Sequence, residues 1–164
     1  MTDSAIVQAH QQAATGKGGK NLAFGCPRGG LSTKIHLAIY GEGRPVRFIR
    51  TPGQVNDSTQ ALALLDGDRP RYVLADKDYD SHAILNSVEA CGPQPIILQR
   101  SQMKRARPFD ARIYKKRSLV ERAINKLKHF RCIAAHYDRK PANFMVFLCP
   151  APLPMWLPLN VEST

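Results

Sequence analysis

Four polar residues in the second half of the chain have the types and spacing of a site that handles phosphate groups. In chain order they are Tyr114, Arg117, Glu121 and Lys128, separated by two, three and six residues. On a helix that advances about 100° per residue, these side chains fall within about 60° of one another. A carboxylate between an arginine and a lysine on one helix face can meet both a metal ion and a phosphate backbone.

A plainer interpretation of the same glutamate stays open. Glu121 lies four residues after Arg117 and four before Asn125, so it can form ordinary surface pairs that contribute only tenths of a kcal/mol. An apolar stripe next to it would pack this helix against a sheet, and it consists of Ile113, Val120, Ile124 and Leu127. The helix therefore places Glu121 at the border between core and surface.

Two further aspartates compete for a role in the same chemistry. Asp76 directly follows the apolar segment 71–75 (RYVLA), which is typical of a strand, so its carboxylate lies at a strand end or serves as a turn or cap residue. Asp57 precedes the segment 58–65 (STQALALL), where an N-cap is the expected role for it or for Asn56. Asp76 is the stronger candidate.

The charge of the chain is concentrated in one segment. The 164 residues carry 24 Lys and Arg against 13 Asp and Glu, a formal net charge of +11. Residues 100–131 hold twelve basic residues and two acidic ones, which is nearly all of this excess. Such a segment can neutralise several phosphates and release their counterions, so nucleic acid is the expected partner, with a solvated basic face as the alternative.

Other functional classes lack support in the sequence. The four cysteines and five histidines show no spacing typical of a zinc site or a disulfide framework, and they predict reduced thiols and structural histidines. The most apolar stretch, residues 144–159, is broken by four prolines and is too short to span a bilayer. We expect a cytoplasmic protein without a membrane partner.

The predicted elements alternate in a recognisable order. We expect a strand near residues 3–9, a glycine-rich basic loop at 16–20, and a hairpin formed by 32–40 and 46–51. A short helix to residue 65, a strand at 71–75, a helix at 81–91, a strand at 95–99 and a long helix at about 110–130 follow. This order predicts one α/β unit with a mixed sheet flanked by helices.

Several segments together resemble the transposases of bacterial insertion sequences, families four and five. The segment 114–128 (YKKRSLVERAINKLK) matches the tyrosine, arginine, glutamate and lysine signature of these enzymes at every fixed position. The segment 74–81 (LADKDYDS) is similar to their second-aspartate region, and RGGLSTKIH, RFIRTPGQVNDST and NKLKHFRCIAAHYDRKPANF are similar to the regions around it. The resemblance covers about residues 1–148.

The resemblance implies a ribonuclease-H-like fold and a catalytic triad of two aspartates and one glutamate. It places the first aspartate on Asp3, the second on Asp76 and the glutamate on Glu121. Three crowded carboxylates need a cation, and hard oxygen ligands suit two magnesium or manganese ions. Such a site uses water to cut the phosphodiester bonds at the ends of the insertion sequence. It then joins the freed 3′ hydroxyl of the DNA to target DNA.

The resemblance also implies a set of DNA contacts. Arg117 is expected to grip phosphates with a bidentate fork and Lys128 as a point charge. Tyr114 is expected to bond a phosphate or stack on a base, and a packing role for it stays open. Further DNA-binding candidates on the helix are Lys115, Arg122 and Lys126.

Three features depart from the family pattern. The chain begins two residues before Asp3, so we expect it to lack the helical N-terminal region of complete members. Asp78 replaces a usual glycine beside the second aspartate. Prolines at alternate positions fill a segment that is usually helical, which predicts a catalytic domain at 1–148 and a proline-rich irregular tail at 149–164.

The expected function is therefore DNA transposition by a metal-dependent transposase core. The partner is double-stranded DNA, and the protein is expected to act as a homo-oligomer on it, alone or with the product of an upstream reading frame. Two alternatives stay open, a ribonuclease-H-like nuclease without strand transfer and a non-catalytic DNA-binding transposase fragment. Whether this copy is active is a question for cleavage and joining assays.

Overall fold

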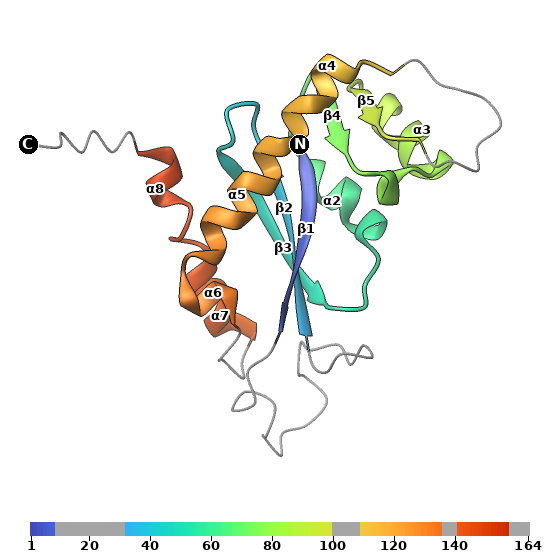
Figure 1. Cartoon of the computed structure of the whole chain (residues 1–164). Coiled ribbons are helices and arrows are strands. Elements are labelled where there is room, and N and C mark those ends of the chain that lie inside the picture. Colours follow the sequence, from blue (N-terminus) through green and yellow to red (C-terminus); the bar gives the residue numbers. More distant parts are fainter. Residues whose placement is uncertain (9–31, 100–108, 136–140, 158–164) are drawn as a thin grey trace, which may run out of the picture.

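The computed structural model describes residues 1–8, 32–99, 109–135 and 141–157. The expected basic loop at 16–20 and four basic residues of the segment 100–131, Arg100, Lys104, Arg105 and Arg107, lie outside this part. The described part contains a three-stranded sheet and a two-stranded sheet, each with its own helices, in two neighbouring regions (Figure 1).

A three-stranded antiparallel sheet forms the first region. Its strands are β1 (Thr2–Gln8), β2 (Ser32–Ile39) and β3 (Pro45–Pro52), in the order β1-β2-β3. β2 and β3 form the predicted hairpin, and β1 pairs along its whole length with β2, which places Asp3 opposite Leu37 and Ser4 opposite His36. Since β1 has no second hydrogen-bonded neighbour among the described strands, one of its edges is open.

The second region is built around a parallel pair of strands. β4 (Tyr72–Ala75) pairs with β5 (Gln94–Ile97), and α3 (His82–Ala90) connects them through a crossover. β4 also contacts β1. We expected one mixed sheet, and the described strands instead form two hydrogen-bonded sheets that lie side by side, since β1 and β4 touch without a shared ladder.

Helices α5 (Ser118–Lys128), α6 (Arg131–Ala134) and α7 (Pro141–Leu148) lie on one side of the three-stranded sheet (Figure 1). Their apolar side chains share a core with the residues of β1 and β2 that point to this face. Val120 and Leu127 of the predicted stripe are buried there, and Ile124 is partly buried. The buried members of this core are Val7, Ile35, Leu37, Ile39, Val120, Ala123, Leu127, Ile133, Phe144, Leu148 and Ala151.

The opposite face of the sheet is covered by η1 (Asp57–Gln60) and α2 (Ala61–Leu65), both of which follow β3. Leu64 of α2 is fully buried, and α2 contacts β2 and β3. η1 contacts η2 (Lys77–Tyr79), the turn that leaves β4. The segment after β3 thus connects the back of the first sheet to the end of the second.

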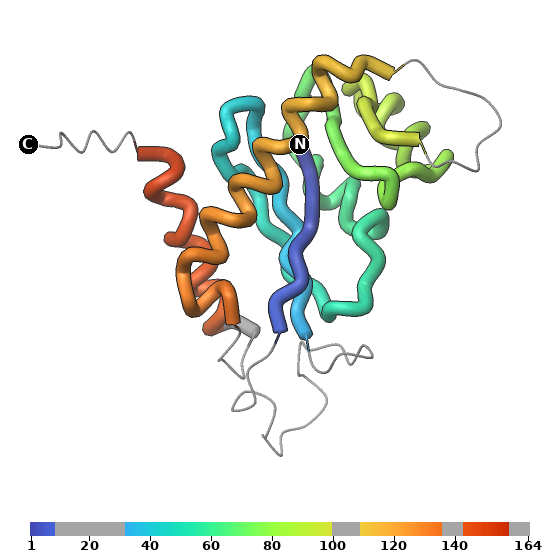
Figure 2. Tube along the Cα trace, in the orientation of Figure 1, coloured from blue at the N-terminus to red at the C-terminus, as the bar shows by residue number. Residues whose placement is uncertain are grey.

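The predicted helix from 110 to 130 forms in three parts. Asp110 caps α4 (Ala111–Tyr114) by accepting hydrogen bonds from the backbone N–H groups of Arg112 and Ile113, and a 3₁₀ turn, η3 (Lys115–Arg117), leads into α5. The axis runs on without a break in the chain path (Figure 2). The shared face predicted for Arg117 and Glu121 is preserved, since the two side chains form an i, i+4 ion pair.

The C-terminal tail departs from the expected irregular structure. Residues Leu153–Trp156 form α8, with Pro152 as N-cap and Pro154 in the first turn. The expectation that alternate prolines prevent a helix is wrong here, because first-turn residues need no intrahelical donor. The Trp156 Nε1–H donates to the Pro45 carbonyl at 2.9 Å, which fixes α8 to the start of β3.

Candidate active site

The three carboxylates predicted to act together lie on three elements that meet at one place. Asp3 is on β1, Asp76 follows the last residue of β4, and Glu121 is in the first turn of α5. β1 contacts both β4 and α5. The start of β1 lies beside the junction of η3 and α5 in Figure 2, so strands that are remote in sequence bring the aspartates to the helix.

Arg117 joins all three carboxylates. Its Nη2 lies 3.4 Å from Asp3 Oδ2 and 3.3 Å from Asp76 Oδ2, while its Nη1 donates to Glu121 Oε1 at 2.5 Å. The Arg117 side chain is only 17% exposed, against 50% for Glu121. The surface pair between Arg117 and Glu121 that the sequence left open does form, but the same guanidinium also contacts Asp3 and Asp76.

The second oxygen of each aspartate is held by the local backbone. Asp3 Oδ1 accepts the N–H of Ser4 at 2.8 Å, and Asp76 Oδ1 accepts the N–H of Lys77 at 2.7 Å. Asp76 is the N-cap of η2, so the cap role considered for it is also real. These local bonds fix the two side chains so that the free oxygens of both point to Arg117.

Burial and mutual repulsion set the charge balance of the site. The pKa of Asp3 is raised by burial and by the charges of Asp76 and Glu121, against the Ser4 hydrogen bond and Arg117, which lower it. Burial lowers the pKa of Arg117, but the aspartates and Glu121 outweigh it and the net shift is upward. The guanidinium therefore keeps its charge and is the cation that these carboxylates share.

Two tyrosines lie close to the carboxylates. Tyr79 is buried, its hydroxyl has no partner among the described residues, and burial followed by Asp57 and Asp3 raises its pKa. Tyr114 packs against Phe109 with ring centroids 5.0 Å apart, and burial is the first cause that raises its pKa. The packing role left open for Tyr114 is thus present in the structure.

An open groove of about 750 Å³ begins at Asp3 and Glu121 and runs along β1 and α5. Glu121, Asn125 and Lys128 occupy successive turns of α5 on one wall. Asp78, the departure from the family glycine, also lines the groove and is exposed. The remaining lining residues are Asp3, Ser4, Ala5, Ile6, Lys34, Asp57 and Ile124.

The DNA-binding candidates divide into two groups. Arg117 contacts all three carboxylates, and Lys128 lines the groove together with Asp3 and Glu121. The exposed residues Lys115, Arg122 and Lys126 neither line the groove nor contact the carboxylates. The structure thus brings Arg117 to the three carboxylates and Lys128 to the groove, and leaves the other three basic residues outside it.

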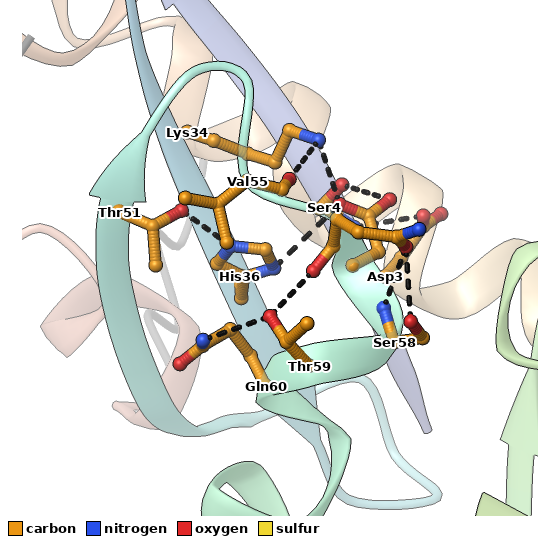
Figure 3. A network of polar contacts seen from close by, with 11 residues as sticks. Asp3, Ser4, Lys34, His36, Thr51, Val55, Ser58, Thr59 and Gln60 are labelled. Atoms are coloured by element: carbon orange, nitrogen blue, oxygen red, sulfur yellow. Dashed lines mark hydrogen bonds and ion pairs between the residues drawn. The ribbon is translucent and has the colours of Figure 1, made fainter. Parts of the chain in front are cut away.

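Asp57 has a different position from the expected one. The cap predicted at Asn56 or Asp57 forms at Asn56, which accepts the N–H of Ser58, so the Asp57 alternative is wrong. Asp57 instead accepts hydrogen bonds from Ser4 and Lys34, which Figure 3 labels, and all three residues line the groove. Lys34 and His36 are two residues apart in a predicted strand and therefore lie on the same face of it. Two polar residues on a buried face were the sequence signal for this hydrogen-bond network.

The three carboxylates provide hard oxygen donors, and their shared need for a cation is met here by Arg117. Within the described ranges, no group of three or more His, Cys, Asp or Glu side chains is close enough to hold a metal. The donor chemistry fits a divalent ion, while the present spacing fits a guanidinium.

None of the helices in the described part has the length and apolar character needed to cross a bilayer. Likewise, the three cysteines of that part, Cys91, Cys132 and Cys149, are free thiols.

Comparisons with known proteins agree with the resemblance seen in the sequence. The chain is 33% identical over 132 residues to a protein of Brucella ovis named as a transposase for insertion sequence element IS6501, covering 77% of this chain and 99% of that protein. It is 32% identical over 120 residues to one of Burkholderia cepacia named as a transposase for IS402, covering 66% of this chain but 54% of that protein. No solved structure matches the chain significantly.

The family model described as the transposase DDE domain matches residues 2–148, which include all three carboxylates and the groove. This span is most of the 164 residues. The chain therefore belongs to the DDE transposase family, whose function is DNA transposition.

Proposed function

We propose that Asp3, Asp76 and Glu121 are the catalytic carboxylates and that they hold two magnesium or manganese ions. The observation that carries the proposal is the contact of one guanidinium, Arg117, with all three side chains. A single positive group satisfies three acidic residues from three elements, which is the charge pattern that a divalent ion needs. Bound ions supply Lewis-acid activation of the attacking oxygen and stabilisation of the leaving one.

The chain's own residues then handle DNA. Were the three carboxylates to hold ions in place of Arg117, its planar guanidinium fork would be available to bind a phosphate oxygen. Lys128 binds a second phosphate further along the groove, and Asn125 lies between it and Glu121. Lys115, Arg122 and Lys126 contact DNA outside the groove as sequence-independent phosphate partners.

The fold proposed for this site is ribonuclease-H-like. The order of an antiparallel three-stranded sheet, a helix, and a strand, β4, that contacts β1 and pairs in parallel with β5 supports it, as does the family. The reaction is cleavage at the element ends by water, followed by attack of the 3′ hydroxyl on target DNA. Both relatives named as transposases belong to insertion sequence elements, which supports terminal repeats as the substrate. Because the two DNA ends of the insertion sequence must be held together, the proposed DNA complex contains a homo-oligomer.

The experiment uses the full chain with labelled duplex DNA that ends in the element's terminal repeats, in magnesium or manganese. We expect cleaved and joined products from the parent and neither from Glu121→Gln. Glu89→Gln is the matched control, because Glu89 is an exposed residue of α3 away from the groove. Cutting without joining would indicate a nuclease, and binding without cutting would indicate a non-catalytic fragment. Equal activity of Glu121→Gln and parent would refute the assignment.

A further inference from the structure

Ser4 connects the first carboxylate of the site to a fourth one. Its backbone N–H donates to Asp3 Oδ1 at 2.8 Å, and its hydroxyl donates to Asp57 Oδ2 at 2.7 Å (Figure 3). Neighbouring residues of a strand point to opposite faces. Asp3 therefore faces Arg117 and α5, while Ser4 faces η1 and is tied to it through Asp57.

Asp57 is itself held in place from β2. Lys34 Nζ donates to Asp57 Oδ1 at 2.8 Å and to the Val55 carbonyl at 2.8 Å, and both charged side chains are mostly buried, with 13% and 17% of their surface exposed. Each oxygen of Asp57 thus has a partner of its own.

His36 extends the network to the third strand. Its Nε2 lies 2.8 Å from the Thr51 hydroxyl, and its Nδ1 lies 3.8 Å from Asp57 Oδ1. Burial lowers the pKa of His36 to about 4, against the opposing charge of Asp57, so the ring is neutral near pH 7. Hydrogen bonds to Asp57 therefore join β1, β2 and η1 behind Asp3, while His36 joins β2 to β3 through Thr51 (Figure 3).

β1 needs such support because of its place in the sheet. Among the described strands it pairs only with β2, and its other edge borders the groove. Asp3 is half-buried near Asp76 and Glu121, whose like charges oppose its ionised form. A displacement of about 1 Å in a reacting group can lower a rate about 100-fold, so small shifts of this edge strand matter.

We propose that Asp57 is a positioning residue that acts through Ser4: it holds β1 from behind so that the Asp3 carboxylate faces Arg117, Asp76 and Glu121. The inference rests on the proposed function for its consequence in catalysis. Its structural part, that the Ser4 hydroxyl links Asp57 to the strand that carries Asp3, is independent of whether the chain cuts DNA. Lys34 holds the Asp57 side chain in place through its hydrogen bond to Oδ1.

A double-mutant cycle tests the pathway. The variants are Ser4→Ala, Asp57→Ala and the double variant, with Asp66→Asn as a control on an exposed acid of the loop after α2. We expect each single variant to slow metal-dependent cleavage at saturating DNA by about 10- to 100-fold with unchanged KM for DNA. The double variant should be no slower than the slower single one, because both remove the same connection.

Two readouts separate positioning from a general loss of structure. The manganese concentration that gives half-maximal binding, followed by electron paramagnetic resonance, should rise equally in Ser4→Ala and Asp57→Ala. Amide hydrogen exchange should speed up in residues 2–8 and stay unchanged in β5. Multiplicative effects in the cycle, parental behaviour of Ser4→Ala, or unaltered manganese binding would overturn the proposal.

These readouts also distinguish the two proposals. If the parent binds manganese but cuts no DNA, the proposed function fails, while manganese binding and exchange in residues 2–8 still decide the role of Asp57. If Asp57→Ala does not fold, Ser4→Ala carries the decision, because it removes one hydroxyl and leaves the Lys34–Asp57 pair intact. Equal loss in the Asp66→Asn control would refute a specific role.

Discussion

Removal of the Arg117 guanidinium is the sharpest perturbation of this site. Arg117→Ala leaves Asp3, Asp76 and Glu121 without their shared cation, while burial and mutual repulsion remain. In the parent, a divalent ion held by the same three carboxylates would have to displace this guanidinium. We therefore expect the variant to be less stable without metal and to gain more stability from metal than the parent does.

The size of the effect follows from the exposure and length of each contact. The pair with Glu121 is half exposed and within one helix, which corresponds to about 0.5 kcal/mol. The contacts with Asp3 and Asp76 are more buried but long, at 3.4 and 3.3 Å, and correspond to about 1 kcal/mol each. A total of about 2.5 kcal/mol lowers the unfolding midpoint of a chain of this size by about 5 to 10 °C.

Thermal unfolding in chelator and in magnesium measures both parts of this prediction. Arg122→Ala is the matched control, since Arg122 is an exposed arginine of the same helix that does not line the groove. Magnesium at about 100 times its dissociation constant adds about 2.7 kcal/mol to a protein that binds it only when folded. An unchanged midpoint of Arg117→Ala in chelator, or a magnesium shift no larger than that of the parent, would refute the reasoning.

Three other predictions concern parts of the fold that support the site. Asp110→Ala removes the cap bonds to the first turn of α4 and should lower the free energy of unfolding by about 1 kcal/mol in a denaturant titration, with no change in the slope. Burial lowers the pKa of His36 from 6.5 to about 4, so the unfolded chain binds a proton that the folded chain does not between these values. Stability should therefore decline as the pH falls from 6.5 to 4, and His36→Gln, measured by the same titration at several pH values, should flatten this decline; an equally steep decline would contradict the assignment. Trp156 is the single tryptophan, and its ring contacts that of Tyr40 edge to face with centroids 6.2 Å apart. Tyr40→Ala should therefore shift the tryptophan fluorescence to longer wavelength. An unshifted spectrum would show that α8 does not depend on this contact.

The helix that carries Glu121 could be predicted from local sequence because its information is local. The apolar stripe with 3.6-residue spacing and the cap at Asp110 specify a helix wherever the chain packs, and the spacing of Arg117 and Glu121 fixes their shared face. The hairpin of β2 and β3 follows for the same reason, since alternation and a short turn are neighbouring features. The family resemblance then supplied Asp3, which no local pattern marks.

The contacts among distant elements were decided by the tertiary structure. The guanidinium of Arg117 reaches Asp3 across 114 positions and Asp76 across 41, and no local rule specifies such pairs. Asp57 illustrates the same limit: its place before a helix predicted a cap, but Asn56 takes that role and packing turns Asp57 to Ser4 and Lys34. The sequence by itself determined the helix, the hairpin and the family; only packing decided which charged side chains share one site, because that depends on which strand edges and helix faces meet.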